Sequence, residues 1–232
     1  MMNALADIWN NLDWSVPAQL LLRVVPALLC ITLHELSHGF TACLLGDTTA
    51  RDAGRLTLNP VRHIDPMGLL MMIVFRVGWA KPVPVNMYRF RDPKGGMALT
   101  ALAGPVSNLV ICVVFLFLYG VCYTPLYVTA RLGDFGRTLM EMFYLTAYIS
   151  LGMGLFNLLP VPPLDGSKVL FAVLPENAYE VLMRYERYGM IALMMLVWSG
   201  FLGSPLTTAV SWLFDRLFAV AVFGFRLTGG LR

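Results

Sequence analysis

Two histidines and a glutamate lie inside a long apolar run of this chain. The run extends from residue 17 to residue 45, and it contains the sequence His34-Glu35-Leu-Ser-His38. A run of this length predicts a helix that crosses a bilayer, because about 20 residues span the hydrocarbon core. Ionisable side chains at that depth are costly, so they indicate a functional site rather than ordinary packing.

The spacing of the two histidines suits a metal ion. Four residues advance an α-helix by about 400°, so His34 and His38 share one face, about 40° apart. Neutral imidazole is a favoured zinc ligand. Glu35 projects about 100° further round, where it can take a proton from a water molecule without binding the metal. This HExxH pattern is typical of zinc metallopeptidases, and it predicts one zinc ion per chain.

The composition is that of a membrane protein. Of the 232 residues, 58% are hydrophobic and 13% are charged, whereas soluble domains carry about 25% charged residues. The net charge of +3 gives no indication of nucleic-acid binding. We therefore expect an all-α, multi-pass membrane protein that forms a single domain over residues 1–232, without a cleavable signal peptide.

Hydropathy predicts about five transmembrane helices after a short amphipathic lead-in at residues 1–16. A charged stretch, 175–187, separates the core of the protein, about 17–175, from C-terminal helices within 188–226. The last run either spans the bilayer or lies in its interface. The predicted helices cover residues 17–45, 97–119, 139–159, 188–203 and 206–226.

The stretch between the first two spans contains an apolar part that is too short to cross. Residues 68–75 are apolar, and the prolines of the following Lys81-Pro-Val-Pro-Val-Asn86 cannot continue a helix. We predict a re-entrant β-hairpin or loop beside the histidine pair, with an ordinary interfacial loop as the alternative. An edge strand there can pair with an extended substrate. The candidate substrate-binding residues are Lys81, Val83, Val85 and Asn86.

A third metal ligand is predicted where the third span breaks. Three prolines in the sequence from Asn157 to Gly166 end the helix, and Gly166 allows unusual backbone angles, so Asp165 can point into the bundle. The region 46–96 carries eight Lys and Arg residues, so it should face the cytoplasm. The histidines, the Lys81–Asn86 segment and Asp165 then fall on one side of the membrane. Asp165 completes a three-ligand site with an open fourth position.

Three other polar residues have weaker assignments. Asn108, in the second span, either makes an interhelical hydrogen bond or polarises a substrate carbonyl. Cys30 shares the metal face but is interpreted as a small buried side chain, and the four cysteines are expected to be reduced. His63, in the loop, is interpreted as structural.

Five ordered motifs resemble the site-2 protease family of intramembrane zinc metalloproteases, in its short bacterial-type form. Together they cover most of residues 25–175. The motifs are HELSH (34–38), GRLTLNP…HIDPMG (54–68), GWAKPVPVN (78–86), ALAGPVSN (101–108) and NLLPVPPLDG (157–166).

The resemblance implies a three-helix catalytic core. We expect the protein in the cell (inner) membrane, with the active site toward the cytoplasm, as the basic residues of region 46–96 indicate. It implies His34, His38 and Asp165 as zinc ligands, Glu35 as the base, and Asn108 near the site. The expected activity is regulated cleavage of membrane-spanning protein substrates within the lipid bilayer. No PDZ or CBS domain fits into this length, and the oligomeric state is not predicted.

Two other classes of protein must be weighed. A zinc transporter would place histidine and aspartate in its helices, but it would not require Glu35 between the ligands. It would also spread polar residues along a path, whereas here they cluster at one depth. An inactive scaffold would have lost a ligand or the base, and none is missing. The sequence therefore favours a peptidase.

Overall fold

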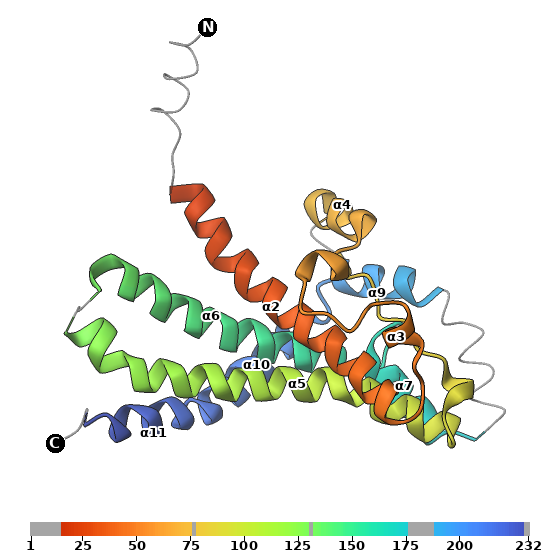
Figure 1. Ribbon diagram of the computed structural model, residues 1–232. Helices are drawn as coiled ribbons and strands as arrows, with labels where there is room; N and C mark the ends of the chain where they lie inside the picture. The colour runs from red at the N-terminus through yellow and green to blue at the C-terminus, as the bar shows by residue number, and fades with distance from the viewer. Residues whose placement is uncertain (1–14, 76–77, 130–131, 176–187, 230–232) are drawn as a thin grey trace, which may run out of the picture.

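The structure is a computed structural model that describes residues 15–75, 78–129, 132–175 and 188–229 (Figure 1). Regular structure in these residues is helical, and they contain no strand. The prediction of an all-α fold is confirmed. The lead-in predicted at 1–16 and the charged stretch predicted at 175–187 lie almost wholly outside the described residues.

The described residues contain four helical segments that are long and apolar enough to cross a membrane, where about five were predicted. The predicted run 188–203 contains only a ten-residue helix, α9 (Gly189–Trp198), which measures about 15 Å and is too short to cross. The four segments are α2 (Ser15–Leu44), α5 (Pro93–Cys122) continued by η3 (Tyr123–Val128), α6 (Gly133–Asn157), and α10 (Gly203–Leu217) together with α11 (Ala219–Leu227).

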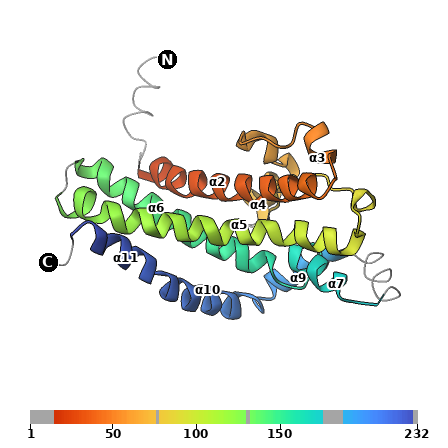
Figure 2. The same cartoon turned by 60° about the horizontal axis from the view of Figure 1, so that its bottom comes forward.

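Helices α5 and α6 form the middle of a three-layer bundle. Helix α2 packs against both of them from one side, and α10 and α11 pack against them from the other (Figure 2). The last apolar run, whose position was left open, therefore lies alongside the spanning helices, which favours a crossing over an interfacial position.

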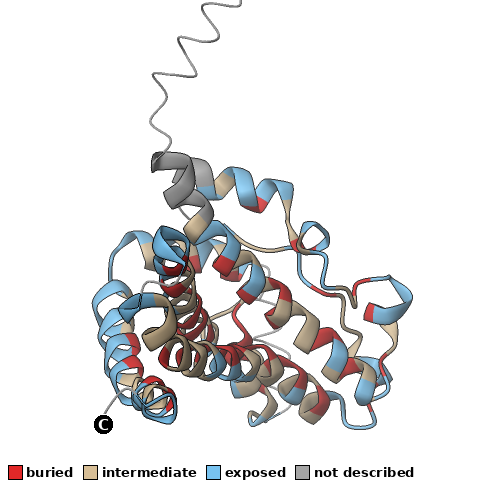
Figure 3. Cartoon of the chain, turned by 60° about the vertical axis from the view of Figure 1, so that its left-hand side comes forward, coloured by how far each residue is buried: buried red, intermediate tan, exposed pale blue. Residues whose placement is uncertain are grey.

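The main apolar core lies between the α5–α6 layer and the layer formed by α10 and α11. It is formed by buried side chains of α5 and α6 together with those of α10 and α11. Figure 3 colours the buried residues of the packed helices red. The outward faces of the same helices expose many large apolar side chains, as expected of surfaces that contact lipid. The core residues are Cys112, Leu116, Ala147, Leu151, Val210, Phe214 and Ala221.

Short elements gather at the end of the bundle where α2 stops and α5 starts (Figures 1 and 2). The Asp65 carboxylate accepts hydrogen bonds from the N–H groups of Met67 and Gly68, at 2.8 and 2.9 Å, and so caps the start of α4. The Asp92 side chain caps α5 in the same way. The short elements are α3 (Thr49–Asp52), η1 (Pro60–His63), α4 (Pro66–Phe75), η2 (Met87–Arg89) and α7 (Asp165–Ala172).

The predicted hairpin takes a different form. The first half of the predicted hairpin is the helix α4. The apolar residues after Pro66 include no proline, so a helix can pair their backbone N–H and C=O groups with one another. Residues 78–86 are not helical, and a single antiparallel bridge joins Ala80 to Ile64. A re-entrant position in the membrane stays a prediction.

Asp47 ties this end of the bundle together. Its side chain is fully buried, and its Oδ2 accepts the N–H of Asn86 at 2.6 Å, while its Oδ1 accepts the N–H of Thr49 at 3.0 Å. Burial alone would raise the pKa of Asp47, but these hydrogen bonds and the charge of Arg89 hold the pKa below its ordinary value. The carboxylate thus anchors the segment before Asn86 to the end of α2.

The contact between α5 and α11 provides a test of this packing. A Cβ atom at Gly120 would lie 1.9 Å from the carbonyl oxygen of Ala221, a backbone atom that cannot move aside alone. Gly120→Ala should therefore destabilise the fold by about 1–3 kcal/mol, as overpacking does. Thermal unfolding in detergent measures this. Gly203→Ala is the control, because nothing lies within 4 Å of a Cβ atom there. Equal melting temperatures for the two variants would contradict the contact.

Candidate metal centre

Helix α2 carries the two histidines on the face that packs against α5. His34 and His38 are both buried, and their ring centroids lie 4.6 Å apart in an edge-on arrangement. The spacing of four residues predicted this shared face. The rings do not stack, so each can turn one nitrogen toward the same point.

Asp165 reaches that point from the first residue of α7. Its carboxylate is buried, and Oδ2 lies 3.1 Å from Nε2 of His34 and 3.2 Å from Nε2 of His38. The following Gly166 allows this approach because a Cβ atom there would lie 2.1 Å from the carbonyl oxygen of Leu158. Gly166 is therefore needed for close packing and not, as its sequence context suggested, for a left-handed backbone angle: it is absent from the glycines with positive φ.

The three side chains form a donor set that fits zinc. Nε2 of His34 and Nε2 of His38 are 3.0 Å apart, so the three donor atoms lie 3.0–3.2 Å from one another. Tetrahedral zinc with bonds of about 2.0–2.1 Å holds its ligands about 3.3–3.4 Å apart. Lone pairs of two imidazoles and a carboxylate repel each other at this separation, and a cation between them removes the repulsion. These are the residues that could hold the metal.

Helix α5 contacts the far nitrogen of each ring. Nδ1 of His38 lies 2.7 Å from the carbonyl oxygen of Thr100. A carbonyl only accepts, so Nδ1 carries the proton and Nε2 keeps its lone pair. Nδ1 of His34 lies 3.1 Å from the side-chain amide of Asn108. Groups of this kind orient the histidine ligands of metal sites.

Glu35 lies beside the donor set and is not part of it. Its side chain is half-buried, and its Oε2 accepts a hydrogen bond of 2.9 Å from the backbone N–H of Val83. The Val83 side chain is buried against α2, where a Cβ atom at Gly39 would lie 2.9 Å from it. The Lys81–Asn86 segment is thus brought next to the glutamate, as the sequence predicted.

The backbone of this segment is largely bonded to the protein. The Lys81 N–H donates to the carbonyl of His63 at 2.9 Å, and the Lys81 carbonyl accepts from Arg55 at 2.8 Å. The Asn86 side chain caps η2 by accepting the N–H of Tyr88. Among the described residues, the N–H of Val85 has no hydrogen-bond partner, so it is the one amide of the segment left for another chain.

The weaker candidates lie outside the donor set. Cys30 is buried and its Sγ donates to the carbonyl of Thr146 at 3.7 Å. His63 is buried in the loop, where its Nε2 lies 2.9 Å from the carbonyl oxygen of Thr57. Both have the structural environments that the sequence suggested.

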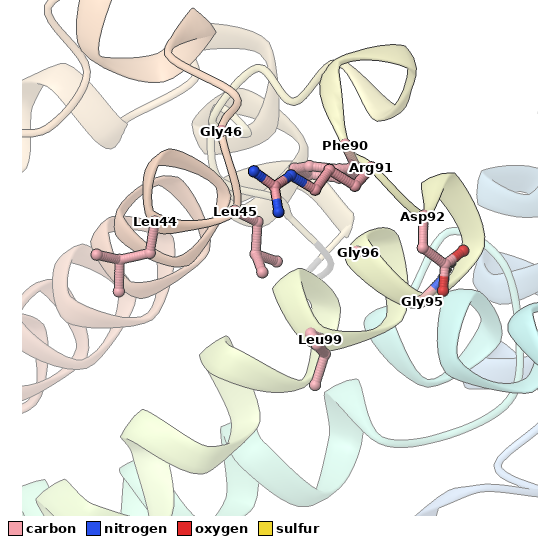
Figure 4. Close-up of a pocket in the computed structure, with 9 residues that line it drawn as sticks. All are labelled: Leu44, Leu45, Gly46, Phe90, Arg91, Asp92, Gly95, Gly96 and Leu99. Atoms are coloured by element: carbon pink, nitrogen blue, oxygen red, sulfur yellow. Dashed lines mark hydrogen bonds between the residues drawn. The ribbon is translucent and has the colours of Figure 1, made fainter.

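A cavity of about 540 Å³ lies between the end of α2 and the start of α5. None of the residues that line it belongs to the donor set, and Figure 4 shows leucine side chains and the side chain of Arg91 around it. It is therefore a separate feature of this end of the bundle.

Sequence reasoning missed three residues that organise the site. Thr100 acts through its carbonyl, which no side-chain pattern reveals. Asp47 is detectable as a turn residue two positions before Thr49, but its bond to Asn86 joins residues far apart in sequence. Gly104 lies within the motif at 101–108, but the motif does not reveal what it packs against. A Cβ atom there would lie 2.5 Å from both histidine rings.

Comparison with known proteins decides the family. Residues 134–199 match the family model described as "Peptidase family M50". A Bacillus subtilis protein named "Putative zinc metalloprotease YwhC" is 36% identical over 189 residues, which cover 82% of this chain and 83% of that protein. The chain belongs to peptidase family M50, the site-2 protease family.

A second relative aligns with a similar share of this chain. The Mycobacterium tuberculosis protein named "Putative zinc metalloprotease Rip2" is 29% identical over 192 residues, covering 81% of this chain and 71% of that protein. No solved structure was found that matches the chain. The site-2 protease resemblance is confirmed: this is a multi-pass membrane zinc metalloprotease, and the transporter and scaffold alternatives are not favoured.

The contact at Gly104 gives the site its own test. Gly104→Ala should push the two rings apart and lower the zinc content of the purified protein from about one per chain to well below it. Elemental analysis of detergent-purified protein measures the metal. Gly152→Ala, a helical glycine with nothing within 4 Å of a new Cβ atom, is the control. Full zinc occupancy in Gly104→Ala would show that the rings and α5 are not in this contact.

Proposed function

We propose that this protein is an intramembrane zinc endopeptidase that hydrolyses peptide bonds within or near the transmembrane segments of membrane proteins. The observation that carries the proposal is the meeting of His34, His38 and Asp165 at one point, with Glu35 beside them. The ligands come from two helices, and the base follows His34 in the chain and is hydrogen-bonded to an extended segment. The whole chain, 1–232, acts as one domain in this proposal.

The three buried side chains would hold one zinc ion, and a set of three protein ligands is typical of catalytic rather than structural zinc sites. When bound, zinc supplies a Lewis acid that polarises a carbonyl group and lowers the pKa of water toward about 7. The orienting contacts from Thr100 and Asn108 hold both rings for this purpose.

Glu35 serves as the general base. The Val83 N–H holds one carboxylate oxygen, Oε2, and leaves Oε1 to take the proton of the attacking water. The same oxygen then returns the proton to the nitrogen of the breaking peptide bond, which therefore leaves as a neutral amine and not as an anion. The segment therefore positions the base as well as lying next to the substrate.

The substrate must be extended where it is cut. A transmembrane helix hides its carbonyls in its own hydrogen bonds, so it has to unwind before a peptide bond is accessible. The Lys81–Asn86 segment can pair with the unwound part through the free N–H of Val85. Val83 contributes packing and its bond to Glu35, while Lys81 and Asn86 hold the segment in place.

The site faces the cytoplasmic side of the inner membrane in this proposal. The region 46–96, which contains most of the short elements near the donor set, carries eight Lys and Arg residues, and the positive-inside rule puts such a region in the cytoplasm. Membrane-spanning proteins or peptides are the proposed partners, within the lipid bilayer.

Replacing the base separates chemistry from metal binding. Glu35→Gln should keep about one zinc per chain and lower cleavage by about 10²- to 10⁴-fold, because it removes proton transfer but no ligand. Zinc is measured by elemental analysis. Cleavage is measured by mass spectrometry on single-span transmembrane peptides in proteoliposomes.

His34→Ala and Asp165→Asn are the companion variants, and both should lose zinc. Loss of zinc in Glu35→Gln would make Glu35 a ligand and would end the proposed mechanism. Full retention in Asp165→Asn would mean that the third ligand is a different residue.

The free amide of the segment can be removed by a single substitution. Val85→Pro deletes the N–H in a stretch that is already extended, and one lost hydrogen bond should lower kcat/KM about 3- to 10-fold. Val85→Ala keeps the amide and is the matched control, and zinc content should be unchanged in both. Equal turnover of the two variants would contradict pairing through this group.

A further inference from the structure

Asn108 has an enclosed polar side chain next to the donor set. It is fully buried in the middle of α5. The backbone carbonyl of Asn108 accepts a hydrogen bond of 2.8 Å from the Ser150 hydroxyl. A Cβ atom at Gly154 would lie 3.2 Å from the Cβ of Asn108. Helix α6 thus holds the backbone of Asn108 in place. Its side-chain amide can only lie against His34.

The two ends of this amide have unequal surroundings. The amide nitrogen lies 3.1 Å from Nδ1 of His34, while the amide oxygen is buried and has no hydrogen-bond partner among the described residues. An unpaired buried oxygen is costly. A half-turn of the amide exchanges the two atoms without moving the ring or the helix, since oxygen and nitrogen have nearly the same size.

The ligand role of His34 decides which end must face the ring. Nε2 of His34 points at the donor set, so a metal needs its lone pair there and the proton must sit on Nδ1. A protonated Nδ1 requires an acceptor. His38 has one in the Thr100 carbonyl. His34 has none unless the oxygen of Asn108 faces it.

We propose that Asn108 is a positioning residue whose Oδ1 accepts the Nδ1 proton of His34 and thereby holds the Nε2 lone pair on the zinc. This inference rests on the proposed ligand set. It gives Asn108 a role toward the metal and not toward the substrate carbonyl, the role that its sequence position first suggested.

Two substitutions at Asn108 separate these roles. Asn108→Leu has a similar size but cannot accept, so zinc affinity should fall about 10- to 100-fold, as for other groups that orient metal-binding histidines. Asn108→Asp can accept at this position, so its zinc affinity should stay within a few-fold of the wild type. Competition with a chelator, on the full chain in detergent, measures affinity without any substrate.

The outcomes are distinct. Wild-type affinity in both variants, with lost cleavage, would overturn the inference in favour of an oxyanion role. Equal zinc loss in both would show that Asn108 acts only through packing. His34→Ala, measured alongside, tests the ligand set itself: if it keeps zinc, the proposed function has failed first.

A measurement on the wild type keeps the inference testable if Asn108→Leu does not fold. Nitrogen-15 NMR of histidine-labelled, zinc-loaded protein reports which ring nitrogen carries the proton. His34 should be protonated on Nδ1 and hydrogen-bonded, as should His38. A proton on Nε2 of His34, or a bare Nδ1, would overturn the inference.

Discussion

The close approach of α5 to the histidine face of α2 is the contact on which the site depends. Gly104 makes it possible, because any side chain there would occupy the space of both rings. Thr100 and Asn108 stand four residues before and after Gly104, so all three lie on one stripe of α5. His34 and His38 have the same spacing on α2. Two matched helical stripes therefore bring a carbonyl and an amide to the two rings.

A second constraint comes from burying polar groups. Each such group needs a hydrogen-bond partner, because an unpaired buried polar group is costly. In this protein two carboxylates of the α2 region bind backbone amides of one extended segment: Glu35 accepts from Val83 and Asp47 accepts from Asn86. The prolines on either side of Val83 remove two amides that would otherwise need partners. The Lys81–Asn86 segment can therefore lie against the site without a neighbouring β-strand to bond its backbone amides.

Much of the site was predictable because it depends on local spacing. The histidine pair follows from helical periodicity, and Asp165 follows from a proline-broken helix on the same side of the membrane as the pair. The helical class follows from apolar run lengths. The remaining features depend on contacts between distant residues. The inward position of Val83, for example, follows from packing against α2 that run length and proline content do not encode.

The bonding of the extended segment limits what it can do to a substrate. Its Lys81, Val83 and Asn86 amides are already bonded within the protein, and only the N–H of Val85 is free among the described residues. Pairing through this N–H and through the segment's backbone carbonyls provides a few hydrogen bonds of about 0.5–1.5 kcal/mol each, whereas unwinding even one turn of a helix in lipid exposes several backbone groups at a cost of several kcal/mol each. Pairing with the segment therefore stabilises an unwound substrate but does not unwind a stable helix. Under the proposed function, selection of substrates depends on how readily their own helices open near the site.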